Sequence, residues 1–202
     1  MNRNKPAPTN MRAYYQSKFT SSRYNLLLVV GMTVVNIVML LLGGSSYFLF
    51  SATIPYSLVI DGVYLTGRLP EEYYTDWPAN IPFYDTSYLA VMIAIAAVVI
   101  LVYLACFFFS KKFKAGWMIA AAVLFVLDTL YMLFFYGVGV DSLMDILLHA
   151  WVLYYLISGA VYGIKLKKLP EDDPLQANGE AIEVPFVDVN APTEENKEDK
   201  AE

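Results

Sequence analysis

The sequence predicts an all-α, polytopic membrane protein. The expected fold is a four-helix transmembrane bundle with an interfacial or re-entrant segment in its first outer loop and a disordered acidic C-terminal tail. Its 202 residues are 57% hydrophobic with a mean hydropathy of +0.47, which is too apolar for an ordinary soluble domain. Four apolar runs, at about residues 24–43, 87–109, 116–136 and 143–164, each reach the roughly 20 residues that a spanning helix needs.

The distribution of basic residues predicts the orientation. Of the 14 Lys and Arg residues, all but Arg68 lie before the first run, between the second and third, or after the fourth. Short loops on the cytoplasmic side of a membrane are enriched in Lys and Arg. We therefore expect a multi-pass plasma-membrane protein with both termini in the cytoplasm. The net charge of −5 conceals +4 over residues 1–168 and −9 over residues 169–202.

The chain is expected to begin with a basic cytoplasmic arm at 1–23, which mixes bases with aromatic residues and suits an anionic membrane surface. The membrane domain then covers 24–168. The first run is too long for the apolar part of a signal peptide and is followed by no clear cleavage site, so we expect an uncleaved span.

The outer loop, 44–86, has two different halves. In the first, 47–66, Pro55 and Asp61 interrupt an apolar stretch, so we expect an interfacial or re-entrant helix that starts near Pro55. A fifth span is the alternative, but it would move the bases at 111–114 to the outside. The second half is acidic and rich in aromatic residues, which fits an aromatic belt at the headgroup level or, alternatively, an aromatic ligand pocket.

The later connections are simpler. The basic loop after the second run and the GVGVDS loop after the third are both short, so the spans they join are expected to be antiparallel neighbours. The segment 169–202 is rich in Pro, Glu, Asp and Asn and has no helical apolar period, so we expect a disordered acidic cytoplasmic tail.

Four polar residues stand out within or near the spans. With a helical rise of about 1.5 Å per residue, Asn36, Asp128 and His149 are expected roughly 10–12 Å below the outer end, with Asp145 nearer the surface. Asp145 and His149 share a helix face. Ionisable groups in a span are costly, so the cluster is a functional hypothesis by default. Three interpretations are open: structural hydrogen bonding between helices, a proton or ion relay through His149, and a ligand or metal site.

Small residues and the single cysteine predict packing. Gly159 and Gly163 form a GxxxG pair in the fourth run, which lets helices approach closely within the bundle or, alternatively, in a homo-oligomer. Cys106 lies inside the second run, where a core or lipid-facing position is expected.

Catalytic motifs are missing from the sequence. One histidine and one cysteine leave few catalytic constellations, and no P-loop, G-x-S-x-G, H-E-x-x-H or CxxC is present. We therefore expect no enzyme, cofactor, bound metal or nucleic-acid partner. A membrane enzyme or metal protein built on the Asp/His cluster stays open as a further alternative.

The stretch NLLLVVGMTVVNIVMLLLGGSSYFLFSATIPY, at 25–56, resembles small four-span membrane proteins of Gram-positive bacteria that carry no assigned activity. The likeness rests on an Asn within the span and the YFLFS segment after it, and it implies a bacterial plasma membrane. Our leading hypothesis is a noncatalytic accessory or interaction subunit, with a protein partner bound through the acidic tail or the basic arm. The alternative is a small transporter or proton-coupled carrier that uses the Asp/His cluster.

Overall fold

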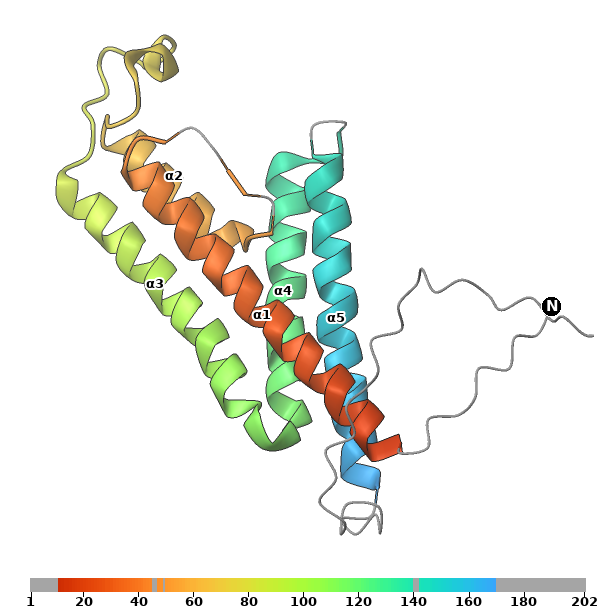
Figure 1. Ribbon diagram of the computed structural model, residues 1–202. Helices are drawn as coiled ribbons and strands as arrows, with labels where there is room; N and C mark the ends of the chain where they lie inside the picture. The colour runs from red at the N-terminus through yellow and green to blue at the C-terminus, as the bar shows by residue number, and fades with distance from the viewer. Residues whose placement is uncertain (1–10, 45–46, 49, 140–141, 170–202) are drawn as a thin grey trace, which may run out of the picture. The chain divides into compact units, whose positions relative to one another are not determined.

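The computed structural model describes residues 11–44, 47–48, 50–139 and 142–169, and within them all regular structure is helical (Figure 1). The helices are α1 (Met11–Leu41), α2 (Thr53–Leu65), α3 (Thr86–Phe109), α4 (Ala115–Tyr136) and α5 (Leu143–Lys168), with 3-10 turns η1 (Glu71–Tyr74) and η2 (Lys111–Phe113). The all-α prediction is confirmed for this part of the chain. The tail from residue 170 and the first ten residues of the predicted arm lie outside it.

Four helices, α1, α3, α4 and α5, are long and apolar enough to cross a membrane, as the four runs predict. Their lipid-compatible surface is extensive, since large apolar side chains such as Leu101, Leu130 and Phe134 remain more than half exposed. A soluble protein rarely leaves so many apolar side chains in water. These four apolar helices indicate a multi-pass membrane protein.

The bundle has two ends of opposite charge. At one, which we call the basic end, α1 and α4 begin and α3 and α5 finish. At the other, the acidic end, α1 and α4 finish and α3 and α5 begin (Figure 1). The described carboxylates all belong to α2, the 66–85 loop and the halves of α4 and α5 toward the acidic end. The described bases, apart from Arg68, lie toward the basic end.

Helix α1 starts earlier than the span predicted from residue 24, because residues 11–23 continue the same helix. Its 31 residues would extend about 46 Å, which exceeds a hydrocarbon core of about 30 Å. The extra turns are held by packing: Phe19 is fully buried and Arg23 reaches α3. The Arg23 guanidinium donates to Ser110 Oγ at 2.9 Å and to the Phe107 carbonyl at 3.1 Å, which satisfies acceptors at the C-terminal end of α3.

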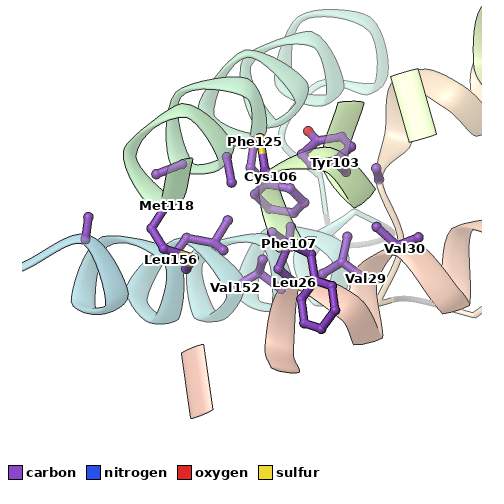
Figure 2. Packing of buried hydrophobic residues seen from close by; sticks show 14 of the residues in the cluster. Leu26, Val29, Val30, Tyr103, Cys106, Phe107, Met118, Phe125, Val152 and Leu156 are labelled. Atoms are coloured by element: carbon purple, nitrogen blue, oxygen red, sulfur yellow. The ribbon is translucent and has the colours of Figure 1, made fainter. Parts of the chain in front are cut away.

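The main apolar core lies where α1, α3, α4 and α5 meet (Figure 2). Figure 2 shows Phe125 of α4 beside Cys106 and Tyr103 of α3, with Val152 and Leu156 of α5 below. Cys106 is thus a small core residue, one of the two positions expected for it. A second, smaller core joins the last turns of α1 to α2 and α3.

Helix α2 is the element that distinguishes this fold from a simple four-helix bundle. Its 13 residues would cover only about 20 Å, so it is too short to be a fifth span. It packs mainly against α3, where Gly62 allows a close approach: a Cβ there would lie 3.0 Å from a Leu89 methyl group. Its N-terminus points toward α4 and its C-terminus toward the start of α3 (Figure 1).

Candidate functional site

Three of the polar residues predicted inside the spans contact one feature that the sequence did not suggest, the start of α2 and the residues before it. Asn36 of α1, Asp128 of α4 and His149 of α5 are each only 1% exposed. All three side chains make contacts to residues 48–53, the segment that leads into α2 and begins it. The site is therefore a socket for the start of α2. We call it the α2 socket, formed by Thr33, Asn36, Asp128 and His149.

Asp128 supplies the N-terminal cap that α2 lacks. The N-cap residue is Ala52, whose side chain has no acceptor for the first N–H groups of the helix. The two carboxylate oxygens of Asp128 replace it: Oδ2 accepts the N–H of Thr53 and Oδ1 accepts the N–H of Ile54, each at 2.8 Å. A carboxylate at this position also matches the positive end of the helix dipole.

The remaining donors at this helix end are also accounted for. A helix leaves its first four N–H groups without internal partners. The Ala52 N–H donates to the Thr33 hydroxyl at 2.8 Å, and that hydroxyl donates to the Val29 carbonyl within α1. Pro55, the third residue of α2, has no N–H. With Thr53 and Ile54 bonded to Asp128, no donor of this buried helix start is left without a partner.

Asn36 binds described residues of the segment before α2. Its side-chain oxygen accepts the Phe48 N–H at 2.8 Å, and its amide nitrogen donates to the Phe48 carbonyl at 2.7 Å and to Ser51 Oγ at 2.9 Å. The Ser51 hydroxyl in turn donates to the Tyr47 phenol. Burial raises the pKa of Tyr47 to about 12, so this phenol remains neutral at ordinary pH.

His149 lies under the first residue of α2. Its Nδ1 is 2.9 Å from the Asp145 carbonyl, which only accepts, so Nδ1 carries a proton. Nε2 is 3.2 Å from the Thr53 hydroxyl and 3.4 Å from Asp128 Oδ2. With a neutral ring, Nε2 accepts from Thr53; with a protonated ring, it donates to Asp128. The ring also stacks on Phe125, with 5.1 Å between centroids.

Asp145 does not join the socket through its carboxylate. Although Asp145 and His149 share a helix face, His149 bonds to the main-chain carbonyl of Asp145. The side chain instead lines a cavity of about 370 Å³ between the start of α2 and the adjacent ends of α4 and α5. Its Oδ1 is buried and has no hydrogen-bond partner among the described residues. Tyr47, Tyr56, Tyr136 and Ser142 also line this cavity.

The glycine pair of α5 lies away from the socket, near the basic end. A Cβ at Gly159 would lie 2.7 Å from Ser22 Cβ, and one at Gly163 would lie 2.7 Å from Phe19 and 2.8 Å from Ala115 Cβ. The two glycines therefore let α5 approach both α1 and α4 within one chain, which is the intramolecular one of the two expected uses.

The sequence-based set lacks one socket residue, Thr33, and two residues that the socket holds, Ser51 and Thr53. Thr33 precedes Asn36 by three positions and so shares its face of α1, which is the one signal that could have found it. In the described residues, no group of three or more His, Cys, Asp or Glu side chains is placed to hold a metal ion. No protein-family model, curated protein or solved structure matches this chain.

Proposed function

We propose that this chain is a noncatalytic integral membrane protein that serves as an accessory or interaction subunit. The observation that carries the proposal is the bonding of Asp128. Both of its oxygens accept backbone N–H groups of α2, and it is 1% exposed. An acid that is fully used in this way is positioned to hold α2, not to bind a substrate.

In the proposed topology, α1, α3, α4 and α5 cross the plasma membrane with the basic end in the cytoplasm, in accord with the positive-inside rule. Helix α2 would then be re-entrant from the outer side. Asp128 lies eight residues before the end of α4, so the start of α2 would be about 12 Å below that end. Irregular backbone at such depth requires full hydrogen bonding by protein groups, and the socket provides it.

The surface best suited to a partner is the 66–85 loop, which we call the outer platform. An aromatic cluster fixes its shape: the Tyr64 and Tyr74 rings stack at 5.3 Å, and Trp77 stacks on Phe83 at 4.8 Å. The Tyr74 phenol donates to the Tyr64 carbonyl and accepts the N–H of Leu69. The loop is thus ordered by its own side chains.

Exposed groups on the outer platform have the chemistry of a protein interface. Tyr73 is 57% exposed and Ile81 is 48% exposed, beside the carboxylates of Glu71, Glu72 and Asp76. Exposed aromatic residues on a preformed surface are typical of interface centres. The acidic rim favours a partner with a basic surface.

Co-purification tests this proposal. The tagged full-length protein is extracted from native membranes in mild detergent, and the associated proteins are quantified by mass spectrometry. We expect a stoichiometric partner that is lost with Tyr73→Ala plus Ile81→Ala. It should be retained with Phe134→Ala, which removes an aromatic side chain of α4 that is 82% exposed. Recovery of no protein above an untagged control would refute the interaction role.

A small carrier remains the second candidate, because the cavity beside the socket contains the unpartnered Oδ1 of Asp145. An unpaired carboxylate oxygen in a buried cavity is a site where a proton or cation would bind. Proteoliposomes loaded with a pH-sensitive dye test it. Proton flux that is present in the wild type and absent in Asp145→Asn would favour the carrier, and flux equal to that of empty liposomes would remove it.

A further inference from the structure

The basic end contains a cavity that the proposed function does not use. It has a volume of about 650 Å³ and lies between the start of α1, the η2 turn with the start of α4, and the last turns of α5. Four basic residues line it: Arg12, Lys112, Lys114 and Lys167. We call it the basic cavity.

Three of these bases, Lys112, Lys114 and Lys167, carry the charge argument. The part of the lining that the structure describes includes no Asp or Glu. The nearest described carboxylates by position along the helices are Asp128 and Asp145, which lie in the halves of α4 and α5 that approach the acidic end. Like charges gathered around one cavity repel one another, and an anion in the cavity would relieve that repulsion.

Backbone geometry contributes to the same site. Lys112 and Phe113 have φ values of 59° and 57°, two consecutive non-glycine residues in the left-handed region. Such conformations cost energy and persist where surrounding contacts impose them, often at binding sites. Here Phe113 packs edge-on against the buried Phe19 ring at 5.6 Å, which leaves Lys112 and Lys114 on either side of it at the cavity.

The start of α4 also faces this cavity. Its N-cap is Lys114 and makes no side-chain cap, and Ala115 and Gly116 line the cavity. A Cβ on Gly116 would meet no atom within 4 Å, so the backbone there is open to the cavity. Free N–H groups at a helix N-terminus favour a phosphate group over a soft or neutral ligand.

The rest of the lining is apolar. Phe113, Ile119, Ile164 and Leu166 line the same cavity, and Ile119 and Ile164 are exposed on the bundle surface. A ligand that fits must therefore combine an anionic head with an apolar portion. From this geometry we infer that the basic cavity binds the phosphate group of an anionic phospholipid.

Fluorescence quenching provides a local test, because Trp117 follows Gly116 directly. The full-length chain with Trp77→Phe and Trp151→Phe, which leaves Trp117 as the sole tryptophan, is placed in phosphatidylcholine nanodiscs. Brominated phosphatidylglycerol and brominated phosphatidylcholine are compared at equal mole fraction. We expect stronger quenching by the anionic lipid. Equal quenching by the two lipids would overturn the inference.

A matched pair of triple variants separates the site from general surface charge. The site variant changes Lys112, Lys114 and Lys167 to Gln. The control variant changes Lys111, Lys165 and Lys168 to Gln, which removes the same charge from the same end outside the cavity lining. At about 1 kcal/mol for each base near an anionic lipid, loss of three bases at the site corresponds to a roughly 100-fold fall in relative affinity.

The control variant is expected to show a smaller fall in relative affinity for the anionic lipid. Its fold-reduction should be at least about ten times smaller than that of the site variant, because its lysines act only through the surface potential. An equal fall in both variants would overturn the site. Thiol labelling of the buried Cys106 checks that both variants are folded.

Two further arms identify the source of the phosphate and the competing occupant. If the cavity holds lipid, added glycerol 3-phosphate leaves the Trp117 quenching unchanged. If glycerol 3-phosphate instead reduces the quenching by displacing the lipid, the cavity is an anion site whose ligand is a soluble phosphate. The second arm changes the tail acids Glu171, Asp172 and Asp173 to amides. If the wild type shows no lipid preference and this variant gains one, the tail occupies the cavity and the lipid assignment is wrong.

Discussion

Replacement of Asp128 by Ala is the most direct test of the α2 socket. The substitution removes both acceptors from the Thr53 and Ile54 N–H groups, which lie 2.8 Å from the carboxylate in a site closed to solvent. A buried donor left unsatisfied costs about 1–3 kcal/mol. For two such donors the cost is about 2–5 kcal/mol of unfolding free energy, after an allowance for relaxation of the helix start.

The isosteric variant Asp128→Asn is expected to lose less stability than Asp128→Ala. An amide retains one acceptor oxygen and presents an NH2 group where the second acceptor was, so one N–H is kept and one is opposed by a donor. The expected order of stability is wild type, then Asn, then Ala. Asp145→Ala is the control, since its carboxylate bonds to no described residue and its loss is expected to change the unfolding free energy by under about 0.5 kcal/mol.

The assay uses the one cysteine of the chain. Cys106 is 2% exposed in the main core, so its reaction with a fluorogenic maleimide during heating reports the opening of the bundle. At about 2–4 °C for each kcal/mol, Asp128→Ala is expected to lower the transition by roughly 4–20 °C. Hydrogen exchange at Thr53 and Ile54 should accelerate first. If Asp128→Ala and Asp145→Ala unfold at the same temperature, the socket does not hold α2 and the reasoning fails.

Three other changes test separate parts of the fold. Gly163→Ala adds a Cβ that would clash with the neighbouring helices, so it is expected to lower the unfolding free energy by about 1–3 kcal/mol in the same labelling assay. Gly31→Ala is the control: its Cβ would meet no atom within 4 Å, so the variant should be as stable as the wild type or slightly more stable. Arg23→Lys cannot reproduce the two-pronged contact with the end of α3 and is expected to cost about 1–2 kcal/mol; equal stability would show that the contact contributes nothing. Asp85 caps α3 through the N–H of Ser87, and that bond lowers the pKa of its carboxyl. Its contribution is therefore present above the unfolded pKa of about 3.9 and is lost as pH falls through the lower folded value, so exchange at the start of α3 should accelerate at acid pH in the wild type and not in Asp85→Asn.

Much of the fold can be predicted from the sequence because a membrane span is a long apolar run, and the hydrophobicity of its residues adds up over the whole run. An apolar run of 20 residues identifies α3 and α4 without knowledge of their neighbours. The boundary of α1 was missed for the opposite reason. Residues 11–23 are polar by composition, and the helix is continued there by single contacts such as that of Phe19 with α5, which no window average detects.

The site was only partly predictable. Depth along the helices predicts one level for Asn36, Asp128 and His149, since rise per residue is a fixed quantity. The structure places His149 3.4 Å from Asp128, and all three side chains are buried. The partner of Asp128 was not foreseen, because its donors are backbone N–H groups about 75 positions away in sequence, and every residue except proline carries one. One local sign existed: α2 has Ala52 as its N-cap residue and so has no capping side chain of its own, which means that its cap must come from elsewhere.

The chemistry of Asp128 also explains why an acid is present at a depth where a neutral residue would be less costly. Two N–H groups point into one small site, and only a carboxylate offers two acceptor oxygens on a single carbon without a competing donor. Its charge is offset by the partial positive charge of the α2 N-terminus, about half an elementary charge. A relay needs both members of an acid–histidine pair to exchange protons. A structural cap needs the acid to stay ionised, while the histidine only has to fill space and bond to Thr53. The geometry therefore makes the pair unequal: Asp128 caps two N–H groups of α2, and His149 contacts only the side chain of its first residue.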